Sequence, residues 1–215
     1  MPTTVIGDNT GDDYSGTEDT QIQSANDTAG GDGPSFEVTK YAVGVHISAL
    51  VRFPGLSNIP SNALFSSTTF SLYLEDAVGV GPHTLTAYRL LQPWVELYAC
   101  WVSYNNVGGF WGTPGGLSDG VDRIATVSAT ASVSATPGYF VFSGAQLAID
   151  AQGMCNGTYP NYGWIIERTD GLDDTTYRQF TARTGADGQR PKLTANWATG
   201  LNVMVGRVRS SGVLN

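Results

Sequence analysis

Hydrophobic and polar residues alternate along much of this chain with a period of two. The clearest run is FSLYLE at residues 70–75, in which Phe70, Leu72 and Leu74 occupy every second position. A half-buried β-strand produces this pattern, because successive side chains point to opposite faces. Further strands are predicted at residues 19–23, 49–53, 85–90, 124–133, 139–142, 163–167, 177–183 and 192–197, and a short helix or helical turn at 146–152.

Turn-forming residues separate the predicted strands, among them Pro137-Gly138, Asp170-Gly171 and Asp187-Gly188. The chain therefore contains about nine or ten strands, and no helix long enough for a βαβ unit. The 27 glycines and the charged fraction of only 14% agree with an all-β protein that is rich in turns. We predict a two-sheet β-sandwich of jelly-roll type.

The two ends of the chain differ from the predicted sandwich, which spans residues 19–197. Residues 1–18 form an acidic N-terminal arm without a core of its own. We expect a partner or a neighbouring copy to hold this arm in an ordered state. In residues 198–215, Leu201, Val203 and Val205 alternate with other residues. This C-terminal tail is expected to pair with an exposed sheet edge, either of its own domain or of a neighbour.

Charge and hydropathy exclude several classes of partner. The net charge of −8 argues against nucleic acid, because binding to phosphates needs a cationic face. No apolar run approaches the roughly 20 residues that a membrane helix requires, so no membrane partner is predicted. The first residues, MPTTVIGDNTGDD, resemble no secretory signal peptide, and we expect either synthesis in the cytosol or a mature fragment that carries an initiator Met.

Catalytic chemistry has little support, and we predict that the protein is not an enzyme. Ser118 lies in a G-x-S-x-G sequence, but neither the preceding strand nor the following helix of a nucleophile elbow is predicted. The two histidines, His46 and His83, lie in an apolar run and beside a proline. Glu96 and Glu167 are expected to bond loop backbone or arginine rather than to act as paired catalytic acids.

No cofactor is predicted with a defined site, and the metal ligands are unknown. Cys100 and Cys155 either form a disulfide or remain two reduced, partly buried thiols, and no Cys/His cluster suits zinc. Oxygen-rich loops, such as the one containing Asp119 and Asp122, leave a structural calcium ion as an alternative.

The aromatic residues divide into predicted core and predicted loop positions. Trp94, Trp101 and Trp164 are expected to pack in the interior. The loop aromatics could stack on sugar rings or could anchor their loops by packing, and both alternatives stay open. These candidate glycan-binding residues are Trp111, Tyr104, Tyr159 and Tyr162, with Asn105, Asn106, Asn161 and Arg168 as the nearest polar candidates.

A series of short motifs occurs in order along residues 19–197. They are Asp19-Thr-Gln-Ile, Ala49-Leu-Val-Arg-Phe53 with Ile59-Pro60, Phe70-Ser-Leu-Tyr-Leu74, Tyr88-Arg89 with Trp94-Val-Glu96 and Cys100-Trp101, Trp111 with Thr113-Pro114-Gly115, Asn161-Tyr-Gly-Trp164, and Arg190-Pro-Lys-Leu193. In this order they resemble the DNRLRE, or disaggregatase-related, β-sandwich domain, which is grouped with carbohydrate-binding modules. Cys100 stands where that family typically has threonine.

The resemblance implies a non-catalytic jelly-roll domain of a kind found on secreted enzymes, cell-surface proteins and phage structural proteins. We favour a structural protein of a virion, as capsid decoration or cement or as a tail or fibre component. It would assemble in the host cytoplasm and dock through its terminal arms on a capsid protein and on copies of itself. The alternative is an extracellular glycan-binding module of a secreted or cell-surface polysaccharide-active protein, and a virion protein could also bind a surface glycan.

Overall fold

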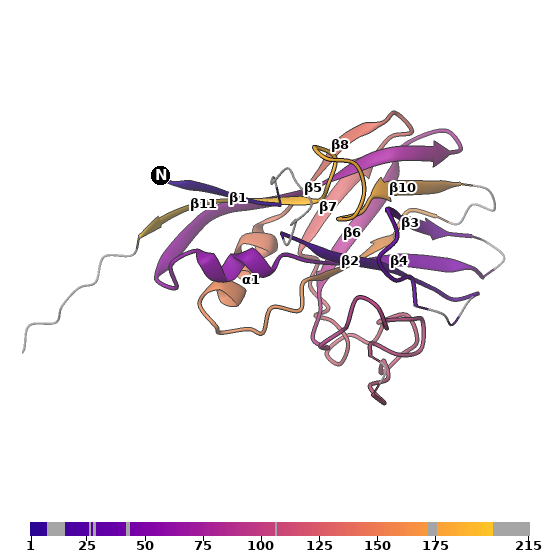
Figure 1. Cartoon of the computed structure of the whole chain (residues 1–215), viewed down its shortest axis with the longest axis horizontal. Coiled ribbons are helices and arrows are strands. Elements are labelled where there is room, and N and C mark those ends of the chain that lie inside the picture. Colours follow the sequence, from indigo (N-terminus) through magenta and orange to yellow (C-terminus); the bar gives the residue numbers. More distant parts are fainter. Residues whose placement is uncertain are drawn as a thin grey trace, which may run out of the picture.

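The computed structural model describes residues 1–7, 16–25, 27, 29–41, 44–105, 107–171 and 176–199 (Figure 1). Within them the chain forms eleven strands, one α-helix and one 3₁₀-helix. The elements in chain order are β1 (Thr3–Ile6), β2 (Glu18–Gln23), β3 (Ser35–Lys40), β4 (His46–Arg52), η1 (Pro54–Asn58), β5 (Ala63–Val78), β6 (His83–Arg89), β7 (Ala129–Val133), β8 (Gly138–Ser143), α1 (Ala145–Cys155), β9 (Trp164–Arg168), β10 (Tyr177–Thr181) and β11 (Lys192–Thr199).

Eight of these strands close into an antiparallel β-barrel, so the prediction of a two-sheet jelly-roll sandwich is wrong. Starting at β5, the order of pairing is β10, β3, β4, β9, β6, β7 and β8, and β8 then pairs with β5 again. A sandwich would leave two separate sheets with open edges, whereas this ring has none. The all-β class itself was predicted correctly.

Strand β5 makes the closure possible because it is 16 residues long. Its first half pairs with β11, its middle pairs with β8, and its last residues, Leu74–Val78, pair with β10. One strand therefore belongs to two sides of the ring. Alternation of side chains is the same in a barrel strand and in a sandwich strand, so the sequence pattern alone could not separate the two folds.

Three strands lie outside the ring. β2 pairs along the full length of β4, from Glu18↔Arg52 to Gln23↔Ile47. β11 continues the sheet from the first half of β5, and β1 pairs with β11 in turn. These two strands and the first half of β5 form an extension at one end of the barrel, beside α1 (Figure 1). Part of the predicted N-terminal arm is thus a strand, while residues 200–215 of the predicted tail lie outside the described residues.

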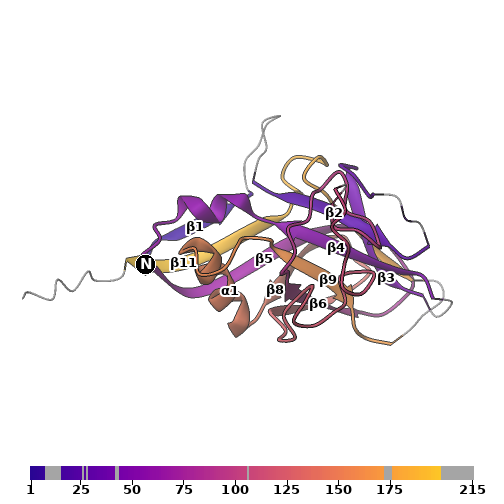
Figure 2. The same ribbon diagram turned by 90° about the horizontal axis from the view of Figure 1, so that it is seen from below.

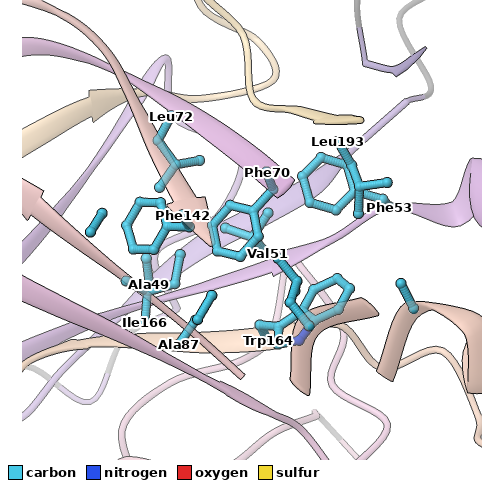
Figure 3. Packing of buried hydrophobic residues seen from close by; sticks show 14 of the residues in the cluster. Ala49, Val51, Phe53, Phe70, Leu72, Ala87, Phe142, Trp164, Ile166 and Leu193 are labelled. Atoms are coloured by element: carbon cyan, nitrogen blue, oxygen red, sulfur yellow. The ribbon is translucent and has the colours of Figure 1, made fainter. Parts of the chain in front are cut away.

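The main core fills the barrel with aromatic and aliphatic side chains (Figure 3). Phe70 and Phe142, from the paired strands β5 and β8, stack with ring centroids 4.6 Å apart. Trp164, on β9, lies 5.9 Å from Phe70 and is fully buried, as predicted. Stacked and tilted ring pairs of this kind add to the free energy gained from burial alone.

A second apolar cluster lies outside the barrel wall, beneath the long loop of residues 90–128. Leu50 on β4 and Ile165 on β9 point outward into it, because their neighbours along each strand point into the barrel. Trp94 and Trp111 from the loop complete the cluster. The loop lies in front of β4 and β9 when the molecule is seen from below (Figure 2). Within the described residues, no helix has the length and apolar character that crossing a membrane requires.

Candidate functional site

A pocket of about 210 Å³ lies where the long loop meets the outer face of β3, β4 and β9. We call it the junction pocket. Its walls combine cationic, anionic, hydroxyl and imidazole groups with one leucine. The lining residues are Thr39, Lys40, His46, Ser48, Leu117, Arg123, Glu167 and Arg168.

The period of two along β4 places two of these residues in the pocket. Ala49 and Val51 belong to the barrel core, so His46 and Ser48 share the opposite, outward face of the strand. Glu167 on β9 is outward for the same reason, because the side chain of Ile166 fills the barrel. The loop then covers this face and supplies the remaining wall.

An ion pair joins the loop to the barrel at the edge of the pocket. Arg123 Nη1 lies 2.7 Å from Glu167 Oε1, and Arg123 Nε lies 3.0 Å from Asp119 Oδ1. The guanidinium group also lies over the ring of Tyr88, 4.1 Å from its centroid. Arg123 therefore has a fixed position, which gives the pocket a preorganised donor wall.

The surroundings of His46 favour the neutral form of its imidazole ring. Burial lowers the pKa of His46 below its usual range, and the nearby Lys40 ammonium lowers it further, while Glu167 opposes them. The ring packs edge-on against Trp101, with 6.1 Å between centroids. The backbone N–H of His46 donates to Ser24 Oγ at 2.9 Å, and no hydrogen bond joins the His46 ring to Ser48 Oγ in the described structure.

The pocket offers both kinds of hydrogen-bonding group to a small ligand. Lys40 and Arg123 are donors, Glu167 is an acceptor, and the hydroxyl of Ser48 can serve as either. A ligand that carries several hydroxyl groups can use donors and acceptors together. The volume limits such a ligand to about the size of one sugar ring.

The carboxylate of Asp122 fixes the fold of the loop near the pocket. It is fully buried and accepts hydrogen bonds from the backbone N–H groups of Gly112, Thr113 and Ser118, at 2.7, 3.0 and 3.0 Å. The backbone N–H of Leu91 also donates to the Asp122 carbonyl. Asp122 thus ties four points of the loop together, which is a structural role rather than a catalytic one.

The partly buried carboxyl group of Glu96 fastens the start of the loop to the barrel. Glu96 Oε1 accepts hydrogen bonds from the Asp19 backbone N–H at 2.9 Å and from Arg183 Nε at 2.5 Å. Asp19 Oδ2 accepts from the Arg183 backbone N–H at 2.9 Å. Burial raises the pKa of Asp19 from 3.8 to about 8, and the nearby Glu96 carboxylate adds to this rise, against the opposing effect of Arg183.

Three of the four predicted sugar-stacking aromatics meet in the second cluster rather than in a pocket. Trp111 is only 5% exposed, and its Nε1 donates to the Cys100 carbonyl at 2.9 Å. Tyr104 packs edge-on against Trp111, and Tyr162 is packed against the same cluster. These three rings pack in the second cluster. Packing was one of the two alternatives for these side chains, the other being stacking on a sugar ring.

Tyr159 lies apart from the other three. It follows α1, and its ring lies beneath the guanidinium of Arg89, which is 4.1 Å from the ring centroid. It also borders a shallow hollow beside α1 with Ile149 and Gln152. The structure therefore does not bring the four predicted aromatics together, and none of them lines the junction pocket.

Of the predicted polar candidates, only Arg168 lines the junction pocket. Asn105 Oδ1 accepts from the backbone of Val107 and Gly109, and Asn161 Nδ2 donates to the Phe53 carbonyl. Asn106 lies outside the described residues.

The other acidic residues and cysteines considered from the sequence make the following contacts in the described part of the chain. Glu96 and Glu167 pair with arginines, as predicted. Cys100 and Cys155 are both buried and free, and burial raises the pKa of the Cys155 thiol. The residues that the structure describes contain no group of three or more His, Cys, Asp or Glu side chains that could hold a metal ion.

Apart from Arg168, none of the residues that line the pocket was predicted as a binding residue. One signal was available for Lys40, which is one of only two lysines in the chain and lies next to the hydrophobic alternation of Phe36 and Val38. His46 was recognised only as a histidine in an apolar run. Its outward direction follows from the register of β4, which the sequence did not give.

Comparisons with known proteins give no relative for this chain. No family profile matches the sequence, and no curated protein matches it significantly. The resemblance to the DNRLRE domain therefore stays a prediction.

Proposed function

We propose that this protein is a non-enzymatic binding protein that holds a small polyhydroxylated ligand, one residue of a glycan, in the junction pocket. The observation that supports the proposal is the preorganised pairing of donors and an acceptor around a cavity of about 210 Å³. Lys40, Arg123 and Glu167 carry these groups, and the Arg123–Glu167 ion pair fixes two of them.

Two features of the pocket favour binding over catalysis. Glycoside hydrolysis needs two carboxyl groups across a cleft, and among the described residues Glu167 is the only carboxylate that lines this pocket. That carboxylate is already paired with Arg123. Acyl transfer would need a hydrogen-bonded nucleophile and base, and His46 and Ser48 lack that bond in the described structure.

A glycan array with the wild-type protein, followed by calorimetry on the best binder, tests the proposal. We expect Lys40→Ala and Glu167→Gln each to weaken binding by about tenfold, since each removes a charge-assisted hydrogen bond. The matched control is Lys192→Ala, because Lys192 is the other lysine of the chain and lies over Tyr139, outside the pocket.

The result could contradict the proposal in two ways. The wild-type protein could bind no glycan on the array, or Lys192→Ala could weaken binding as much as Lys40→Ala does. Hydrolysis of the bound glycan by the wild-type protein would contradict the non-enzymatic part alone.

A structural role in a larger assembly is the second candidate function. One observation favours it: β1, in the predicted N-terminal arm, forms the outer end of the described sheet, where β11 is its one partner among the described strands. A strand in that position can receive a further strand. Docking on a capsid protein in a virion stays a prediction from the sequence.

A further inference from the structure

We propose that two copies of this chain associate through the outer edge of β1, in an antiparallel pairing about a twofold axis. The proposal concerns the sheet extension rather than the junction pocket, so it holds or fails independently of ligand binding. Three observations carry it: the charge distribution, the direction of the backbone groups of β1, and an exposed apolar side chain in the edge strand.

The described elements at the end of the molecule that carries β1 hold few charged side chains. We define this uncharged end as β1, η1, β8, α1, β11 and residues 63–71 of β5. Its only charged residues are Asp150 and Lys192. Asp150 is fully buried and accepts hydrogen bonds from Arg89 Nε and Ser128 Oγ, and the Lys192 ammonium lies 4.0 Å from the centroid of the Tyr139 ring. Depletion of charged residues is what marks the centre of a protein–protein interface.

Backbone groups of β1 face outward in a regular way. The N–H of Trp197 donates to the carbonyl of Pro2, which places Pro2 opposite β11. Every second residue of an antiparallel strand turns its N–H and C=O to the same side. Thr4 and Ile6 therefore face β11, whereas the N–H and C=O groups of Thr3 and Val5 point away from it. In the part of the chain that the structure describes, β1 pairs with β11 alone.

The edge has only one of the devices that usually protect a strand from pairing, its short length of four residues. Lysine, proline or a bulge within an edge strand prevents association, and the strand Thr3–Ile6 has none of these. Val5, in the edge strand itself, is 44% exposed. An exposed apolar side chain on an open edge favours a further strand over water.

A second copy is the partner that these features fit. The rest of the chain is acidic, with a net charge of −8 overall, so two copies repel one another except where they meet through a surface without charge. The edge of β1 is complementary to itself, because an antiparallel pair of identical strands satisfies the outward groups of both. The uncharged end thus provides a contact that costs little electrostatic repulsion.

Sedimentation of the full-length protein over a range of concentrations tests the pairing. We expect the wild type to form a dimer that strengthens when salt is raised, because salt screens the repulsion between acidic copies. Val5→Lys should weaken the dimer by about tenfold or more, since it places a charge in the edge of each copy. Val80→Lys is the matched control, because Val80 is 93% exposed in the turn between β5 and β6, and it should leave the dimer unchanged.

Cysteine variants give a second, geometric test. Cys100 and Cys155 are 8% and 9% exposed, so an added surface thiol would be the reactive one. A mixture of Thr3→Cys and Val5→Cys proteins should form a covalent dimer under mild oxidation much faster than Val80→Cys does, because pairing of the outward groups sets Thr3 of one copy opposite Val5 of the other.

Several outcomes would overturn the proposal. A wild-type protein that stays monomeric at every concentration would do so. A dimer that Val5→Lys and Val80→Lys affect equally would place the contact elsewhere. A monomer whose thermal midpoint falls in Val5→Lys but not in Val80→Lys would assign the edge to another segment of the same chain.

Discussion

Single buried or partly buried carboxyl groups determine how the long loop is held on the barrel. Asp122 organises the loop internally, whereas Asp19 and Glu96 join it to β2 and to Arg183. The two arrangements differ electrostatically. Asp122 accepts three backbone N–H groups, which suit a carboxylate, but Asp19 is fully buried beside the Glu96 carboxylate. Asp19 is therefore the residue whose protonation couples to stability.

Asp19 makes the protein lose stability as the pH rises. Its pKa is about 8 in the folded state and 3.8 for the unperturbed group, so between these values the folded protein binds one more proton than the unfolded chain. The stability that Asp19 contributes is complete below pH 4 and is lost as the pH rises through 8.

Asp19→Asn should flatten this dependence of stability on pH in chemical unfolding at pH 5 and pH 8. Asp187→Asn, which alters an exposed ion pair with Arg190, is the control and should behave like the wild type. Equal losses in Asp19→Asn and the wild type would contradict the prediction.

The residues of the junction pocket could not be found from the sequence, for a physical reason. They come from three distant segments, represented by Lys40, Arg123 and Glu167, that meet only after the barrel closes. The aromatic residues, by contrast, were conspicuous in the sequence because they are large. Their size is also why burial within the second cluster was the stronger driving force for Trp111.

At the scale of the elements, the positions of most strands could be predicted from the sequence, but the way in which the strands pair could not. The compact apolar run of β8 was placed within one residue at each end, whereas the alternation at residues 70–75 marked only part of the 16-residue strand β5. Two strands were not predicted: β1, which is only four residues long, and β3, whose Phe36 and Val38 alternate with charged or polar residues. Pairing between β3 and β10 joins segments far apart in the chain, and no local pattern encodes it.

The junction between β4 and β9 depends on one glycine. Gly163, directly before β9, has φ +69°, and a Cβ at this position would lie 2.1 Å from the Val51 carbonyl oxygen and 2.8 Å from Arg52 Cα. Gly163→Ala should lower the free energy of unfolding by roughly 2 kcal/mol or more, because backbone strain and a backbone clash add together.

Thermal or urea unfolding measures this effect, and Gly81→Ala separates its two causes. Gly81 also has a positive φ, of +85°, but a Cβ there would meet nothing within 4 Å. Gly81→Ala should therefore lower the free energy of unfolding only by the backbone strain, about 1 kcal/mol. Similar losses of stability in the two variants would show that the close approach of β4 and β9 does not restrict the size of the residue at position 163.

At the scale of the whole molecule, the closed ring separates two kinds of surface. The barrel presents its outer face to the long loop, which builds the junction pocket, while the extension carries the uncharged end. Binding of a ligand and association of copies would thus take place on different parts of the molecule. If both proposals hold, Val5→Lys should leave the affinity for a glycan unchanged, and Lys40→Ala should leave the dimer intact.

The pairing of β1 with β11 also sets the order of events while the chain is being made. Thr3 meets Asn196, so β1 leaves the ribosome long before its partner β11 and can pair with it only after almost all of the described chain has been synthesised. At about 5–20 residues per second, that delay is roughly ten seconds or longer. During this interval both edges of β1 are open, and a nascent chain on the same messenger could reach them before β11 does.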